Sequence, residues 1–342
     1  VYKGAVYLPW GPFPAVALMP LFTFVGTLSD RVYTALFGAL NVGIFYLVLI
    51  ELYRYLQRKR DSFLYVLTLF FGFGTVHFSM TTIARVWFTS QVLSLTPFLC
   101  SLLFLIRFLY TKKPVFYIIS FGFFLLAFMG RVWYIFFLPT YVLLLLTTTL
   151  NRKQLSSIAL FVFIFSMIVF RFYGLYNFRR FGSVFETGYN YQRESQEFIS
   201  ARAQFGRYNP RYFLQNVWYE LLNPVMVSYT FPFISADKMG NGLFATSPLF
   251  LLLFFIPKVY KKYKWFILSC SAGVLFFVMQ TLLFFGTGYS QFGHRYLLEI
   301  IPFLILLIVC ALPYINKKLV YVTLIFSLFF HSMGAVWLVM NY

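Results

Sequence analysis

Five arginines border or interrupt long apolar runs in this sequence, namely Arg31, Arg85, Arg131, Arg171 and Arg295. The guanidinium group offers a planar fork of donors that matches the oxygens of phosphate or carboxylate. Charges at the edge of a hydrocarbon layer are costly and usually face an interior cavity. We therefore expect these arginines to contribute to an external cavity that binds a phosphate. Pairing with loop acids or with anionic lipid headgroups is the alternative.

The composition indicates what kind of protein must hold these arginines. Of the 342 residues, 61% are hydrophobic and only 11% are charged, and the mean hydropathy is +0.78. A soluble domain has about 45–50% apolar and about 25% charged residues. This excludes soluble enzymes and nucleic-acid-binding domains in spite of the net charge of +19. We predict an all-α, polytopic membrane protein without a nucleic-acid partner.

Apolar runs of about 17–25 residues are long enough to cross a bilayer as helices. One run, 12–28, contains three prolines, which would remove backbone hydrogen bonds from a membrane-spanning helix. We therefore predict an interfacial or re-entrant helix there and do not count it as a span. The ten candidate transmembrane helices are 34–56, 62–80, 87–109, 114–130, 132–149, 155–175, 239–257, 264–285, 296–315 and 318–340.

The predicted organisation is a single membrane domain over residues 1–342. It comprises the end of an external loop with an interfacial helix (1–29), six transmembrane helices (30–175), an external loop (176–238) and four transmembrane helices (239–342). Within the long loop, FLQNVWYELL (213–222) is a candidate juxtamembrane helix.

The alternation of Lys and Arg gives the orientation. One set of connections carries fifteen basic residues, beginning with Arg54 and ending with Lys318, whereas the short connections of the other set carry five. The more basic side is cytoplasmic by the positive-inside rule. The external side is dominated by Arg rather than Lys, a bias for which topology gives no reason.

Several segments together resemble the GT-C superfamily of membrane glycosyltransferases, in the branch that includes protein mannosyltransferases and lipid A aminoarabinose transferases. The segment 286–307 is the most specific of them. The segments are YLPWGPFPAVALMPLFTFVGTLSDR (7–31), FGFGTVHFSMTTIARVWF (71–88), LLAFMGRVWYIFFLP (125–139), FRRFGSVFETGY (178–189), TSPLFLLLFF (246–255) and GTGYSQFGHRYLLEIIPFLILL (286–307).

The resemblance implies a GT-C type fold in a bacterial plasma membrane, with its active face outside. It implies a glycosyltransferase that takes a sugar from a polyprenyl-phosphate carrier, with the phosphate as leaving group. The acceptor would be a glycolipid, a polysaccharide or a protein. The family's catalytic Asp lies in the first external loop, which would precede Val1, so we expect the chain as given to lack that loop.

Arg131 and Arg295 are the first candidates for contact with the donor phosphate. Arg131 separates two apolar runs without an acid nearby in sequence, although it could snorkel to the headgroups. Arg295 could instead pair with Glu299 at i,i+4 on a helix. Further candidates for the donor site are Arg85, His294, Arg31, Lys3 and Tyr7.

Two acids are candidates for the catalytic carboxylate within this chain. Glu186 lies among aromatic residues in the long loop, where an apolar rim could raise its pKa; a solvated loop acid is the alternative. Asp30 could belong to the site or serve as the N-cap of the helix that follows. His294 could carry a proton or be structural. No metal-ligand cluster is visible, so a divalent metal remains without support.

Other classes of function share some of these features. A transporter or flippase for lipid-linked sugars would be expected to show repeated halves and polar residues near mid-membrane. A polysaccharide polymerase or ligase would share the external basic cavity. The expected partners are the bilayer, the lipid-linked sugar and its acceptor. Four tyrosines of the long external loop could form a surface that binds the sugar or the acceptor, namely Tyr189, Tyr191, Tyr208 and Tyr212.

Overall fold

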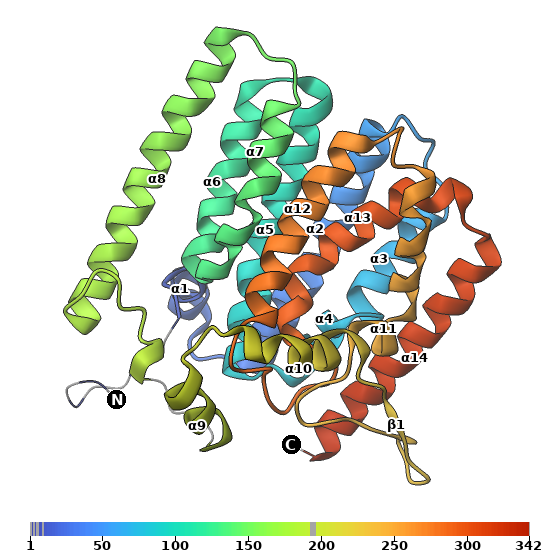
Figure 1. Cartoon of the computed structure of the whole chain (residues 1–342). Coiled ribbons are helices and arrows are strands. Elements are labelled where there is room, and N and C mark those ends of the chain that lie inside the picture. Colours follow the sequence, from blue (N-terminus) through green and yellow to red (C-terminus); the bar gives the residue numbers. More distant parts are fainter. Residues whose placement is uncertain (1, 3, 5–6, 9, 192–195, 342) are drawn as a thin grey trace.

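The long apolar runs form helices that lie side by side and cross the molecule from one end to the other (Figure 1). The computed structural model describes residues 2, 4, 7–8, 10–191 and 196–341, and Lys3 lies outside them. Of the residues described, only β1 (Met226–Val227) and β2 (Ile234–Ser235) form a sheet, an antiparallel pair.

Six helices in the described part of the chain are long and apolar enough to cross a membrane, and α3 (Phe63–Phe73) with α4 (Val76–Ile83), bent by 48°, could form a seventh span. The six are α2 (Asp30–Tyr55), α5 (Val86–Thr111), α8 (Arg152–Phe181), α12 (Lys264–Leu282), the unit of η6 (Arg295–Ile300), α13 (Ile301–Ala311) and η7 (Leu312–Tyr314), and α14 (Lys317–Asn341).

The helical class predicted from the sequence is confirmed, and the six long apolar helices are consistent with a membrane protein. The count of about ten spans is not confirmed. The remaining predicted spans correspond to shorter apolar helices. They are α6 (Pro114–Gly130), η1 (Val132–Phe137) with α7 (Leu138–Leu146), and η5 (Pro248–Lys258). At 1.5 Å per residue, α6 reaches about 26 Å, slightly less than the hydrocarbon thickness of about 30 Å. The segment 12–28 forms α1 (Phe13–Val25), which is too short to span.

Buried hydroxyl and amide groups join α2 to α5. The Thr34 and Thr89 hydroxyls lie 2.7 Å apart. The Asn41 amide donates to the carbonyl oxygen of Val92 at 2.9 Å and accepts from the Thr96 hydroxyl at 2.6 Å. Helix association in a membrane relies on close packing and interhelical hydrogen bonds, because lipid tails are as apolar as the side chains. These contacts fix the register of α5, and therefore the position of Arg85 just before it.

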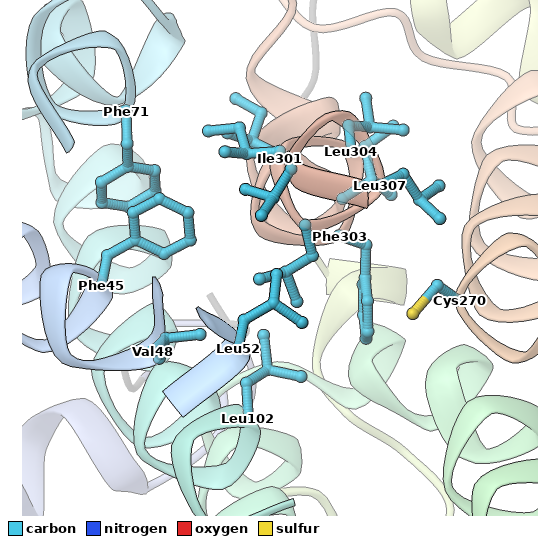
Figure 2. Packing of buried hydrophobic residues seen from close by; sticks show 14 of the residues in the cluster. Phe45, Val48, Leu52, Phe71, Leu102, Cys270, Ile301, Phe303, Leu304 and Leu307 are labelled. Carbon is cyan, nitrogen blue, oxygen red and sulfur yellow. The ribbon is translucent and has the colours of Figure 1, made fainter. Parts of the chain in front are cut away.

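The helix α13 forms the centre of the bundle. All eleven of its residues are buried, as expected for a helix that is apolar on every side. Figure 2 shows Phe303 of α13 near Leu52 of α2 and Leu102 of α5, with Cys270 of α12 on the far side. This packing holds η6, which leads into α13, against the inner helices.

The end of α6 is closely packed on two sides, and this determines where Arg131 lies. A Cβ atom on Gly130 would lie 2.1 Å from the Ser94 hydroxyl of α5, and one on Gly11 would lie 1.9 Å from the carbonyl oxygen of Met129. Only glycine permits such approaches. The α-helix stops at Gly130, Arg131 takes an extended conformation, and η1 follows.

The connection after α8 covers one end of the bundle (Figure 1). It contains η2 (Tyr189–Tyr191), α9 (Gln196–Phe205), η3 (Pro210–Tyr212), α10 (Phe213–Val217) and the π-helical turn η4 (Trp218–Leu222), followed after the β pair by α11 (Leu243–Thr246). The juxtamembrane helix predicted at 213–222 is thus confirmed as α10 with η4. The α8 helix runs beyond its predicted end at 175 to Phe181.

Side chains of α10 and η4 attach this connection to α12. The Asn216 amide donates to the carbonyl oxygens of Thr281, Leu282 and Phe284 at 3.2, 3.0 and 2.7 Å. These contacts satisfy carbonyl groups that the end of a helix leaves without partners. The Thr281 hydroxyl also donates to Glu220 Oε2 at 2.8 Å.

Candidate functional site

A cavity of about 380 Å³ lies at the end of the bundle that the long connection covers. Its volume is within the range of about 300–1,000 Å³ that is usual for small-molecule sites. Polar and aromatic side chains line it, and among the described residues four of these are arginines: Arg85, Arg131, Arg207 and Arg295. Three of the five arginines expected at an external cavity, Arg85, Arg131 and Arg295, therefore meet at one cavity. Arg31 and Arg171 are exposed and do not line it.

Each arginine reaches the cavity from a different segment. Arg85 immediately precedes α5, Arg131 immediately follows α6, and Arg295 begins η6. Arg207 belongs to the long connection: its carbonyl oxygen accepts from the Phe285 amide at 2.9 Å, so that the two strands of chain lie antiparallel beside the cavity. Arg207 is not among the arginines that the sequence indicates as candidates.

The Arg131 side chain forms an ion pair with Glu299. Nη1 of Arg131 lies 2.9 Å from Oε1 of Glu299, and the Glu299 side chain is almost completely buried. The Gln91 amide donates to the same Glu299 oxygen at 3.3 Å and to the carbonyl oxygen of Arg295 at 3.0 Å. Gln91 therefore connects the ion pair to the backbone that carries Arg295.

The alternative pairing of Arg295 with Glu299 on one helix is wrong. Residues 295–300 form a 3₁₀ rather than an α-helix. With about 120° per residue, positions four apart point in directions about 120° away from each other rather than along one face. The Glu299 side chain consequently points to Arg131, and the Arg295 side chain lines the cavity.

Aromatic rings support the guanidinium groups. The Cζ atom of Arg131 lies 4.9 Å from the Trp133 ring centroid, that of Arg295 5.0 Å from the Tyr296 ring, and that of Arg85 5.5 Å from the Trp87 ring. Arg207 lies 6.0 Å from the Tyr189 ring. Stacking of this kind contributes about 0.5–2 kcal/mol per contact. These contacts fix the orientation of each guanidinium group at the cavity.

Three buried polar atoms of the lining have no hydrogen-bond partner among the described residues. They are Oγ of Ser90, Nη2 of Arg207 and Nε of Arg295. Buried polar groups in folded proteins are almost always paired, so unpaired ones call for an explanation. Two of the three are cationic donors, and an anion in the cavity would supply their acceptors.

The loop before η6 is held by Gln291. Its amide donates to the carbonyl oxygens of Met239 and Thr287 at 2.7 and 3.0 Å, and its side-chain oxygen accepts from the Arg295 amide at 3.2 Å. A Cβ atom on Gly288, where φ is +90°, would lie 2.8 Å from Gln291 Nε2. Glycine is therefore required for this loop to close around Gln291 and to place Arg295.

His294 does not line the cavity, although it adjoins Arg295 in the sequence. Its side chain is buried, and burial, together with the positive charge of Arg295, lowers the pKa of His294 to about 3. An imidazole with so low a pKa is neutral at pH 7, which does not fit the proton-carrying role expected from a near-neutral pKa. His294 instead packs edge-on against the Tyr296 ring, which stacks on Arg295.

Asp30 and Arg31 also lie outside the cavity lining. Asp30 is the first residue of α2 and accepts a hydrogen bond from the Tyr33 hydroxyl. The N-cap position belongs to Ser29, so the interpretation of Asp30 as the N-cap is wrong. Arg31 is exposed at the start of the same helix.

Glu186 and Tyr7 lie outside the lining as well. The Glu186 carboxylate accepts hydrogen bonds from the Gly188 amide at 2.7 Å and from the Asn190 side chain. It therefore stabilises the loop to which it belongs. The Arg180 guanidinium lies 5.3 Å from the centroid of the Tyr7 ring, and this ring meets that of Phe181 edge to face. Of the four tyrosines expected to form a sugar or acceptor surface, Tyr189 lines the cavity.

A second, apolar cleft of about 340 Å³ lies between α6 and α8. Its lining is entirely hydrophobic and includes Gly122, Leu126 and Phe165. A Cβ atom on Gly122 would have no neighbour closer than 4.0 Å. Figure 1 shows α8 at the side of the bundle, next to α6.

Comparisons with known proteins found no match to this chain, whether among protein-family models, curated proteins or solved structures. In the part of the chain that the structure describes, no three His, Cys, Asp or Glu side chains are grouped so that they could hold a metal ion. Conclusions about function therefore depend on the cavity itself.

Proposed function

We propose that this chain is a GT-C type membrane glycosyltransferase that takes a sugar from a polyprenyl-phosphate carrier on the external face of the membrane. The observation that carries the proposal is the convergence of four arginines, from four separate segments, on one cavity. Arg131 forms an ion pair with Glu299, whereas Nη2 of Arg207 and Nε of Arg295 have no hydrogen-bond partner among the described residues. Positive charges so close together repel one another, and a bound anion removes that cost.

The chemistry of the transfer explains why such a site is useful. The bond between the sugar C1 and the phosphate oxygen breaks, and its electron pair stays on that oxygen. The acceptor hydroxyl oxygen forms the new bond to C1 and gives up its proton to a base. The carrier phosphate therefore gains one negative charge as the sugar leaves. Fixed guanidinium groups stabilise this developing charge more than they stabilise the donor.

The remaining lining suits a sugar. Trp10, Trp87, Trp133, Tyr189 and Tyr296 all border the cavity, and aromatic rings offer flat apolar faces beside polar edges. No carboxylate is among the lining residues that the structure describes, so these residues supply the phosphate-binding part of the reaction. The base that receives the acceptor proton is not assigned to any of them.

The cleft between α6 and α8 is suited to the hydrocarbon chain of the carrier. Leu126, in its lining, lies four residues before Gly130, the last residue of α6, which is a rise of about 6 Å. Arg131 of the cavity follows Gly130 directly, so the cleft and the cavity lie near the same end of α6. A lipid with its phosphate beside Arg131 would have an apolar path between the two helices for its chain.

The proposal is tested with purified protein and a polyprenyl-phosphate sugar that carries a radiolabel in the sugar. We expect transfer of the label to an acceptor with release of the polyprenyl phosphate, and Arg295→Gln should reduce the rate by about 100-fold, as removal of one oxyanion-stabilising donor does elsewhere. Arg31→Gln, an exposed arginine outside the cavity, should leave the rate unchanged. Movement of the intact donor across the membrane without release of the lipid would instead identify a flippase, and equal rates for both variants would exclude the cavity.

A further inference from the structure

We infer that the cavity accepts a diphosphate-linked rather than a monophosphate-linked lipid. This inference rests on the proposed function and names the chemical class of its donor. The structural basis is the number and arrangement of the charges around the cavity. Arg85, Arg131, Arg207 and Arg295 contribute four positive charges, and Glu299, paired with Arg131, contributes one negative charge. The net charge provided by these five side chains is therefore +3.

The charge of the leaving group distinguishes the two classes of donor. A sugar linked to a lipid through one phosphate is a diester with a single negative charge, and its departure leaves a monoester of about −1.5 to −2 at pH 7. A sugar linked through a diphosphate carries two negative charges. The lipid diphosphate that remains has one further ionised ester phosphate, so its charge is about −2.5 to −3. The charge of the second product matches the net charge of these five side chains.

The number of donors leads to the same conclusion. One guanidinium can bind two oxygens of a phosphate with two parallel N–H groups. One arginine is therefore sufficient for the two non-bridging oxygens of a phosphodiester, whereas the four non-bridging oxygens of a diphosphate need two arginines. Arg131 uses one nitrogen for Glu299, but Nη2 of Arg207 and Nε of Arg295 remain without protein partners among the described residues.

Arg207 is the arginine that best tests this inference. It comes from the connection that covers the bundle rather than from the end of an apolar helix. The antiparallel contact between Arg207 and Phe285 fixes its backbone independently of its side chain. Loss of its charge should therefore remove one ligand contact and leave the other three arginines in place.

The experiment measures the affinities of the purified protein for geranyl monophosphate and geranyl diphosphate, in detergent with a metal chelator present. We expect the diphosphate to bind at least about tenfold more tightly. Arg207→Gln should reduce that preference to about threefold or less, mainly by weakening diphosphate binding, and Arg207→Lys should keep more of it because the charge remains. Arg211→Gln is the matched control, since Arg211 is exposed and does not line the cavity.

The possible outcomes separate this inference from the proposed function. If neither lipid binds, the proposed donor site itself is wrong. If both bind with equal affinity, the donor is a monophosphate and the proposed function stands without the diphosphate. A preference for the diphosphate that Arg207→Gln leaves unchanged would also overturn the inference, because the preference would then arise outside this set of arginines.

Discussion

Nη1 of Arg131 lies 2.9 Å from Oε1 of Glu299, and this ion pair connects the end of α6 to η6 although 168 residues separate them in the sequence. Glu299 is buried beneath the cavity and does not line it, whereas Arg131 does. The carboxylate therefore positions Arg131 without competing for the ligand. Gln91 of α5 hydrogen-bonds to Glu299 as well, so three elements meet at this carboxylate.

Breaking this pair from one side should be costly. We expect Arg131→Gln and Glu299→Gln each to lower the free energy of unfolding, by about 3–5 kcal/mol, because each leaves a buried charge without its partner. The double variant should lose much less than the two single losses together. Thermal or denaturant unfolding in detergent measures this coupling, and additive losses would show that the pair is not a coupled unit.

The apolar cleft should respond to the length of the lipid chain. Gly122→Phe places a ring in the open space beside Phe165 and should weaken binding of a long polyprenyl phosphate by about tenfold. Binding of geranyl phosphate, which is too short to need the whole cleft, should change little. Competition between the two lipids for the purified protein measures the difference.

Gly43→Phe is the matched control for this substitution. Gly43 lies on α2, is exposed, and has no neighbour within 4 Å of a Cβ atom. It should affect neither lipid. Equal weakening of the long and the short lipid by Gly122→Phe would show that the cleft does not hold the chain.

Glu220 should make stability depend on pH. Burial raises the pKa of Glu220 to about 8 in the folded protein, while the Thr281 hydroxyl opposes the shift. Below its ordinary pKa of about 4.3 the carboxyl is protonated in both states, and its contribution to stability is fully present. As the pH rises towards 8, the unfolded chain ionises first, so stability falls by about 1.4 kcal/mol per unit of pKa difference at most.

Glu220→Gln keeps an oxygen acceptor for the Thr281 hydroxyl but cannot ionise. We expect its melting temperature to fall less between pH 5 and pH 8 than that of the original protein, and to be higher at pH 8. Thr281→Val removes the hydroxyl that favours the ionised form, so the loss of stability should extend to higher pH. An identical pH profile for Glu220→Gln would assign the dependence to another group.

The sequence predicts the helical class of the fold more accurately than the number of its membrane spans. Apolar runs are sufficient to identify helices such as α5 and α14, because composition determines which segments can enter a bilayer. The bounds predicted for the span 114–130 are those of α6. The pattern does not show that the predicted span 62–80 breaks into α3 and α4, which are bent by 48°.

Part of the candidate site can also be predicted from the apolar runs. Arg85, Arg131 and Arg295 can be recognised because each stands at the end of an apolar run, where a charge is unusual. Arg207 has no such signal, since it lies in a polar connection and reaches the cavity through its backbone contact with Phe285. The sequence also does not indicate Glu299 as the partner of Arg131, because only the 3₁₀ conformation of residues 295–300 directs Glu299 away from Arg295.

The most direct test of the account is the location of the phosphate in an experimental density map of the protein saturated with a polyprenyl phosphate or diphosphate. We expect phosphorus in the cavity, in hydrogen-bonding contact with the guanidinium groups of Arg131 and Arg295, and the lipid chain between α6 and α8. A headgroup bound at exposed arginines such as Arg31, with the cavity holding no phosphate, would contradict the account.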